Sequence, residues 1–294
     1  MAAGPDIAAP SARVTLGFLA AGLGFLLLPV SDAIAKAMGI GGVHPLQIGW
    51  GRWLAQVVYM LPLALCFYGR KALFPKAPLT QIGLGLSVAG ATVLVFFGLR
   101  ELPMPTVTAT LFVAPLIVTA VSGLVLGERV GPWRWGAVAV GFVGMLLIVK
   151  PGTARFEIGS LYAVGAAICL VLYLLIARKN AGRNPPMVTM LWMGIVGAIG
   201  MTPLALPVFQ AFTAEQWLHI AIMGAVLTLG HGLIVWAADR LEASAMAPMP
   251  YFEMVTATVL GYVVFNEFPA LSVWLGCGLV IGGGLFVAWR ETRR

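Results

Sequence analysis

Residues Leu124–Gly136 have the sequence LVLGERVGPWRWG, and residues Tyr262–Gly276 have the sequence YVVFNEFPALSVWLG. In each stretch an apolar run ends at a glutamate, Glu128 or Glu267, and a tryptophan-containing turn leads into a glycine-rich segment. After a shift of one residue, two pairs of glycines keep the same spacing in the two copies: Gly136 and Gly144, and Gly276 and Gly284. The chain therefore consists of two related halves.

The composition excludes a water-soluble protein. Hydrophobic residues make up 60% of the 294 residues and charged residues only 10%, whereas an average soluble chain has about 25% charged residues. A disordered chain is excluded as well, because disorder requires few apolar and many charged residues. The net charge of +7 lies in short clusters between apolar stretches and forms no continuous basic stripe. The expected partner is the lipid bilayer, and no nucleic-acid partner is expected.

The apolar runs predict the number of membrane crossings, because a bilayer core about 30 Å thick requires roughly 20 apolar residues per helix. Ten such runs cover residues 13–38, 46–68, 81–99, 104–126, 133–150, 158–178, 187–209, 216–238, 243–265 and 271–289. We expect an all-α integral membrane protein with five transmembrane helices in each of two repeats, 13–150 and 158–289. Because five is odd, the second repeat must be inverted in the membrane, which is typical of secondary transporters.

The positions of lysine and arginine predict the orientation, because cytoplasmic loops carry an excess of both. With the N-terminus in the cytoplasm, thirteen of the eighteen Lys and Arg residues lie on the cytoplasmic side. Both termini are therefore predicted to be cytoplasmic. The first apolar run is too long for a cleaved signal peptide, and the short loops favour a bacterial inner membrane.

The glutamate-containing turns and the glycine-rich segments after them resemble the EamA family of the drug/metabolite transporter (DMT) superfamily. The signature is GERVGPWRWGAVAVGFVG at Gly127–Gly144 and NEFPALSVWLGCGLVIGGG at Asn266–Gly284. The second copy departs by an asparagine before its glutamate, and Glu253 stands where the first half has Ala114. The resemblance implies two five-helix repeats, a cavity lined by helices one to four and six to nine, and helices five and ten as outer braces.

Two further stretches, PVSDAIAK at Pro29–Lys36 and HPLQIGWGRW at His44–Trp53, are most similar to amino-acid exporters of the YddG type within this family. Related branches resemble carriers of riboflavin and S-adenosylmethionine, and the fold does not define the cargo. We expect a secondary transporter that exports amino acids by alternating access. The alternative is uptake of riboflavin, S-adenosylmethionine or a similar metabolite.

An enzyme is not expected. An intramembrane lipid-modifying enzyme that uses Asp32, His231 and Glu253 is a remote alternative, and no residue spacing supports it. The sequence has no ATP-binding loop and no metal-ligand spacing, so neither a cofactor nor a metal is expected.

Small residues predict where helices pack closely. Gly278 and Gly282 form a GxxxG pattern, and Ala137 and Gly141 form a similar pair. Both pairs are predicted packing seams. A monomer and a homodimer that associates through these helices are both left open.

The first predicted span contains Ser31, Asp32 and Lys36 beyond Pro29. Asp32 and Lys36 are four residues apart on one helical face, where opposite charges can meet. An ionisable residue in the middle of a membrane helix costs about 2.5 to 3.5 kcal/mol on insertion scales and needs a partner or a cavity. These residues either bind a zwitterionic solute at the cavity mouth or form a structural pair at the outer interface. Arg52 of the second span could hold a carboxylate of the cargo, but it is expected to extend to the interface or to bind Asp32.

Two titratable residues of the second half are candidates for proton coupling or cargo binding. His231 lies between two glycines, and its alternative role is a neutral imidazole that is hydrogen-bonded between helices. Glu253 follows Tyr251, after Pro248 and Pro250, which remove backbone donors and indicate a discontinuous helix. Glu253 either carries a proton or lies near headgroup water at the helix end.

The remaining candidates are aromatic residues and helix-end glutamates. Phe97 and Trp236 are expected to line an apolar cavity, although tryptophan is also common at membrane interfaces. Glu128 and Glu267 are expected to cap or pair with neighbouring helices rather than to touch the cargo. The predicted substrate-binding residues are Ser31, Asp32, Lys36, Phe97, His231, Trp236, Tyr251 and Glu253.

Overall fold

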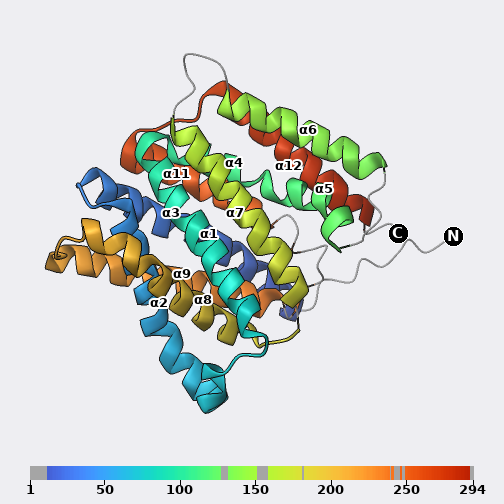
Figure 1. The fold of residues 1–294 in the computed structure, drawn as a ribbon. Coiled ribbons are helices and arrows are strands. Elements are labelled where there is room, and N and C mark those ends of the chain that lie inside the picture. Colours follow the sequence, from blue (N-terminus) through green and yellow to red (C-terminus); the bar gives the residue numbers. More distant parts are fainter. Residues whose placement is uncertain are drawn as a thin grey trace.

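The computed structural model describes residues 12–126, 132–150, 158–180, 182–238, 240–241, 246 and 249–291. The elements are α1 (Ala12–Ile40), α2 (Pro45–Tyr68), η1 (Gly69–Leu73), α3 (Pro78–Glu101), α4 (Met104–Leu111), α5 (Ala114–Leu126), α6 (Pro132–Val149), α7 (Ile158–Asn180), α8 (Pro186–Ala205), η2 (Leu206–Val208), α9 (Ala214–Ala238), η3 (Met249–Tyr251), α11 (Phe252–Phe265) and α12 (Leu271–Glu291). All of these elements are helical (Figure 1), which confirms the predicted all-α fold for the described part of the chain.

Six helical stretches of the described residues are long and apolar enough to cross a membrane. They are Val14–Ile40, Pro78–Glu101, Met104–Val121, Ile158–Asn180, Pro186–Val208 and Ala214–Ala238, and three shorter apolar stretches are Trp135–Val149, Met249–Phe265 and Leu271–Phe286. Each of the ten predicted runs contains helix, whereas the total of ten membrane crossings stays a prediction. The helix α2 belongs to neither set, and its glutamines Gln47 and Gln56 are buried inside the protein.

Contacts between connections define the two ends of the helix bundle. At one end Lys36, near the end of α1, binds both the Leu102 carbonyl between α3 and α4 and the Glu267 carboxylate between α11 and α12. At the other end the α2–α3 connection binds the α7–α8 connection through Lys76 and Asn184. These ends are called the Glu267 end and the Asn184 end below.

The two halves run in opposite directions between these ends. The helix α1 ends near the Glu267 end, whereas α7, the first helix of the second half, begins there, because Gly159 packs against Glu101 and Leu102. Likewise α2 runs toward the Asn184 end, whereas α8 begins beside Asn184. Matching helices are therefore antiparallel, as an inverted repeat requires.

The fourth helix of each half is interrupted at a corresponding position. In the first half α4 ends at Leu111 and α5 begins at Ala114, and in the second half the 3₁₀ turn η3 directly precedes α11. When segment 102–150 is placed beside segment 241–289, Phe112 corresponds to Tyr251. The rings of these two residues pack edge to face with centroids 5.4 Å apart. Equivalent residues thus contact each other, as expected beside a pseudo-two-fold axis.

The helices α6 and α12 lie side by side along one flank of the bundle (Figure 1). A Cβ atom on Gly144 would lie 2.6 Å from the Gly276 carbonyl oxygen, and one on Gly276 would lie 2.5 Å from the Gly144 carbonyl oxygen. Such a close approach of two backbones requires glycine on both helices. These two helices are the fifth of the first half and the last of the second, which were predicted as outer braces.

The predicted seam at Gly278 and Gly282 was wrong for the contacts within one chain. A Cβ on either glycine would meet nothing within 4 Å. Gly278 and Gly282 follow Gly276 by two and six residues. In a helix with 3.6 residues per turn, these positions lie on a different face from the one that contacts α6. The seam at Ala137 is confirmed, because the backbone of Ala137 lies 3.1 Å from a Cβ placed on Gly283.

This packing predicts that Gly276→Val lowers the unfolding temperature of the purified protein in detergent. The added side chain must separate α6 from α12, and overpacking costs about 1 to 3 kcal/mol. Gly278→Val is the matched control, since it adds the same side chain to open space two residues away. Equal unfolding temperatures for the two variants would contradict the assigned α6–α12 contact.

Candidate transport site

A partly buried ion pair joins α1 to α2. The Arg52 Nη1 atom lies 3.3 Å from Asp32 Oδ1, and the two side chains keep 12% and 27% exposure, respectively. The pairing of Arg52 with Asp32 confirms one of the roles predicted for Arg52. Each charge thereby gains the partner that an ionised group among membrane helices requires.

Aromatic rings and an unpaired donor surround the Arg52 guanidinium. Its central carbon lies 5.5 Å from the centre of the Phe96 ring and 5.8 Å from that of Trp53, within the range of cation–π attraction. The Arg52 Nε atom is buried without a hydrogen-bond partner among the described residues, as is Ser31 Oγ beside Asp32. A planar guanidinium with a free edge is suited to a second carboxylate.

Two titratable residues of the second half lie on helices that pack against α1, the helix of Asp32. His231 is on α9 and Glu253 is on α11. His231 Nδ1 lies 2.9 Å from the Leu227 carbonyl oxygen, so this nitrogen carries the proton and the other ring nitrogen is left for another partner. Asp32, Arg52, His231 and Glu253 are called the charge cluster below, and they come from both repeats.

Lys36 does not bind Asp32, and this predicted pair was wrong. Its ammonium nitrogen lies 2.6 and 2.7 Å from the two carboxylate oxygens of Glu267 and 2.9 Å from the Leu102 carbonyl oxygen. These three acceptors use all three ammonium hydrogens. The long side chain reaches beyond the face that it shares with Asp32, toward the helix end where the acceptors lie. In this conformation Lys36 has no donor left for a solute.

Glu267 ties a second element to the same bridge. Its Oε2 atom accepts a hydrogen bond of 3.1 Å from the backbone N–H of Met104, the first residue of α4. The Phe265 ring centre lies 5.2 Å from the Lys36 nitrogen. The expectation that Glu267 pairs with a neighbouring helix is confirmed, and its counterpart Glu128 lies outside the described residues.

The three predicted aromatic residues make their ring contacts with residues outside the charge cluster. Phe97 packs against His44 and Tyr162, with ring centroids 5.7 and 5.2 Å away. Trp236 is exposed and carries the Arg240 guanidinium 3.7 Å above its ring. Their roles in binding cargo stay predictions.

Tyr251 points toward the brace helices. Its hydroxyl would lie only 2.2 Å from a Cβ placed on Gly284 of α12, and its ring packs on Phe112. A close neighbour of Arg52 is instead Phe96, which was not among the predicted substrate-binding residues. The signal was present, because Ala89, Thr92 and Phe96 are spaced by three and four residues along one buried face of α3.

The sequence profile of the EamA-like transporter family matches residues 15–150 and again residues 157–289. The chain belongs to this family. A relative from Rickettsia prowazekii (strain Madrid E), "S-adenosylmethionine uptake transporter", is 25% identical over 90% of this chain and 89% of its own length. A "Riboflavin transporter" from Vibrio cholerae is 26% identical over 95% of this chain and 94% of its own length.

A crystal structure with 20% sequence identity superposes on this EamA-like protein with a TM-score of 0.64, covering 97% of this chain and 100% of that chain. This likeness supports the fold. The family match supports a multi-pass membrane transporter of small metabolites, as the sequence predicted. The particular similarity to amino-acid exporters gains no support, because the relatives named here are uptake or riboflavin transporters.

The Lys36–Glu267 bridge predicts a stability test for this EamA-like transporter. Lys36→Met leaves the Glu267 carboxylate without its cation, and breaking a buried ion pair from one side costs about 3 to 5 kcal/mol. The double variant Lys36→Met/Glu267→Met removes both charges and should recover much of that loss. Unfolding temperatures in detergent measure both effects.

The control is Arg100→Met, which removes an exposed cation near the same end of the bundle. Its unfolding temperature should match that of the unmodified protein. If the single and double bridge variants lose equal stability, the two side chains are not energetically coupled and the bridge is not a structural tie.

Proposed function

We propose that this protein is a secondary carrier that takes up S-adenosylmethionine, or a closely similar metabolite with an amino-acid head group, through the charge cluster. The observation that carries the proposal is the Asp32–Arg52 pair, 3.3 Å apart, beside the two helices of the other repeat that contain His231 and Glu253. A site between inverted repeats is where secondary transporters bind their cargo.

The chemistry of S-adenosylmethionine matches the residue types of the cluster. Its amino-acid head carries an ammonium and a carboxylate, and its sulfonium adds a second positive charge. Asp32 and Glu253 supply carboxylates for the cationic groups, and the unpaired Nε edge of Arg52 supplies donors for the cargo carboxylate. Phe96 offers an apolar ring within 5.5 Å of the same guanidinium.

Two competing cargoes use the site differently. An amino acid, the first expectation from the sequence, has the same zwitterionic head and would use the same pair without the adenine. Riboflavin has no ionised head group, so it would depend little on Asp32. The relatives support S-adenosylmethionine and riboflavin as the cargoes to test first.

The proposed transport cycle opens the two ends alternately. In the conformation described here, the Lys36–Glu267 bridge joins α1 of the first repeat to the α11–α12 connection of the second at the Glu267 end. Release of the cargo toward this end would require that bridge to separate. Because Lys36 is buried and Glu267 is partly buried, separation needs a new partner or water for both charges.

Counterflow in proteoliposomes tests the proposal. Vesicles are loaded with unlabelled S-adenosylmethionine, and accumulation of the labelled compound is followed with recovery of unchanged solute by mass spectrometry. Accumulation is expected, and Asp32→Asn and Glu253→Gln should each reduce it about tenfold or more, because a hydrogen bond to a charged group contributes about 1.5 to 3 kcal/mol. Glu215→Gln, at the exposed start of α9, should transport normally.

Competition separates the cargoes. Excess unlabelled amino acids should inhibit weakly and riboflavin not at all. Complete inhibition by free amino acids would return the function to amino-acid transport. Accumulation of riboflavin, unaffected by Asp32→Asn, would replace the proposal with riboflavin transport, and a chemically altered solute would indicate an enzyme.

A further inference from the structure

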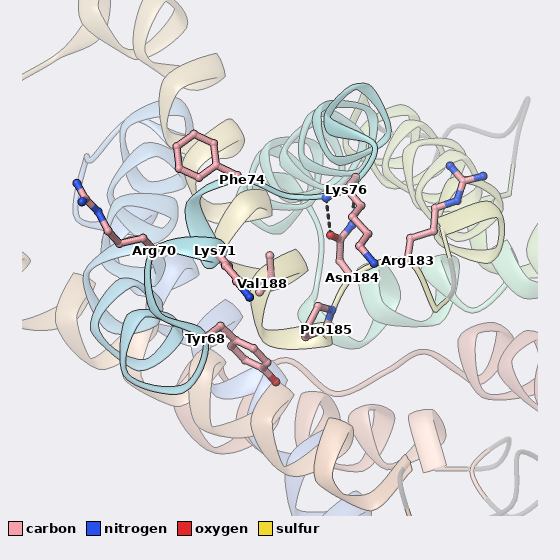
Figure 2. A pocket seen from close by; sticks show the side chains of 9 residues that line it. All are labelled: Tyr68, Arg70, Lys71, Phe74, Lys76, Arg183, Asn184, Pro185 and Val188. Carbon is pink, nitrogen blue, oxygen red and sulfur yellow. Dashed lines mark hydrogen bonds between the residues drawn. The ribbon is translucent and has the colours of Figure 1, made fainter.

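A pocket of about 520 Å³ lies at the Asn184 end, far along the helices from the Lys36–Glu267 bridge. It opens between the α2–α3 connection and the α7–α8 connection, which belong to different repeats. Four cationic side chains line it: Arg70, Lys71, Lys76 and Arg183. Figure 2 shows the Lys71 amine between the two connections, with Arg70 and Arg183 extending to opposite sides.

Hydrogen bonds between the two connections hold the pocket walls in place. The Lys76 N–H donates to Asn184 Oδ1 at 2.7 Å, and Asn184 Nδ2 donates to the Lys76 carbonyl oxygen at 2.8 Å (Figure 2). Trp192 of α8 donates from Nε1 to the Ala72 carbonyl oxygen at 3.1 Å. The pocket is therefore built from backbone that is already fixed, and a ligand need not order these connections on binding.

The four cations have no carboxylate partner among the described residues. Two ion pairs among the described residues join Lys36 to Glu267 and Arg52 to Asp32, and both lie away from this pocket. Four like charges around one pocket repel each other, and an anion with several acceptor oxygens relieves the repulsion. A phosphate group meets this requirement, since arginine and lysine both bind its oxygens.

Apolar side chains adjoin the cations. Tyr68, Phe74 and Val188 line the same pocket, and the Phe74 side chain is 79% exposed. Leu79, one residue into α3 from Pro78, is 81% exposed on the adjoining surface. Inorganic phosphate has no apolar part that could cover such a surface, whereas a phospholipid has acyl chains that can.

We propose that this pocket binds the phosphate head group of an anionic phospholipid, with the acyl chains lying along Phe74 and Leu79. Basic pockets between transmembrane helices on the cytoplasmic side are suited to such head groups. The excess of lysine and arginine at the Asn184 end agrees with a cytoplasmic location for it. The bound lipid joins one connection from each repeat, and it does so independently of which cargo the protein carries.

Binding to short-chain lipids in detergent tests this site, with native mass spectrometry to count bound lipids and thermal unfolding to measure stabilisation. Dioctanoyl phosphatidylglycerol should bind and raise the unfolding temperature, while dioctanoyl phosphatidylcholine and inorganic phosphate should not. Lys71→Gln and Lys76→Gln should each weaken phosphatidylglycerol binding about fivefold, because one basic residue beside an anionic lipid head group contributes a factor of about this size to the affinity.

The matched control is Lys179→Gln, which removes an exposed cation at the same end without touching the pocket. It should bind phosphatidylglycerol normally. Equal weakening in all three variants would mean general attraction to an anionic surface and would overturn the pocket. Equal binding of inorganic phosphate would assign the site to a free anion, and equal binding of phosphatidylcholine would show that the cations do not matter. No assay here uses the cargo, so failure of the transport proposal leaves this result unaffected.

Discussion

The bridge between the buried Lys36 and the partly buried Glu267 is the contact on which the arrangement of the repeats depends. An ammonium that is 5% exposed among membrane helices must have all its hydrogens satisfied, and here two carboxylate oxygens and one carbonyl oxygen do so. Because Glu267 also accepts from the N–H of Met104, one carboxylate fixes the end of α1, the start of α4 and the turn before α12. Moving any one of these elements alone would leave a buried charge without its partner. The elements are therefore expected to move together, or to separate in a step that breaks the bridge.

The sequence predicted the helices and their inverted order because hydropathy and the repeated glutamate turn are local signals. It also allowed the Asp32–Arg52 pair. It could not identify the partner of Lys36, because Glu267 lies 231 residues away and only the folded chain brings the two together. The contact of Phe96 with Arg52 was not predicted for a related reason: the spacing of apolar residues indicates a buried face of α3, but it does not say that this face meets α2. For the same reason the contact with α6 is made by Gly276 and not by the predicted Gly278, which points to a different side of α12.

The backbone of the protein is close to symmetric, whereas its chemistry is not. The fourth helix is interrupted in both halves, and the equivalent rings of Phe112 and Tyr251 meet. Two aligned positions further along, however, the first half has Ala114 and the second has Glu253. Only the second half thus has a carboxyl group beside the interruption of its fourth helix. An inverted repeat supplies two similar conformations, and such an asymmetric charge can bias the protein toward one of them.

The two ends of the bundle handle charge in different ways, and this difference bears on how the protein works. At the Glu267 end a cation is neutralised by the chain itself, so closing this end needs no outside group. At the Asn184 end four cations surround an open pocket and depend on anions from the surroundings. The Lys36–Glu267 bridge must break for the Glu267 end to open. The basic pocket, in contrast, can keep its ligand during the transport cycle, because the hydrogen bonds between Lys76 and Asn184 make the two connections move as one body. We therefore expect the main energy barrier of the transport cycle to be the opening of the Glu267 end. The connections at the Asn184 end are expected to keep their mutual arrangement throughout the cycle.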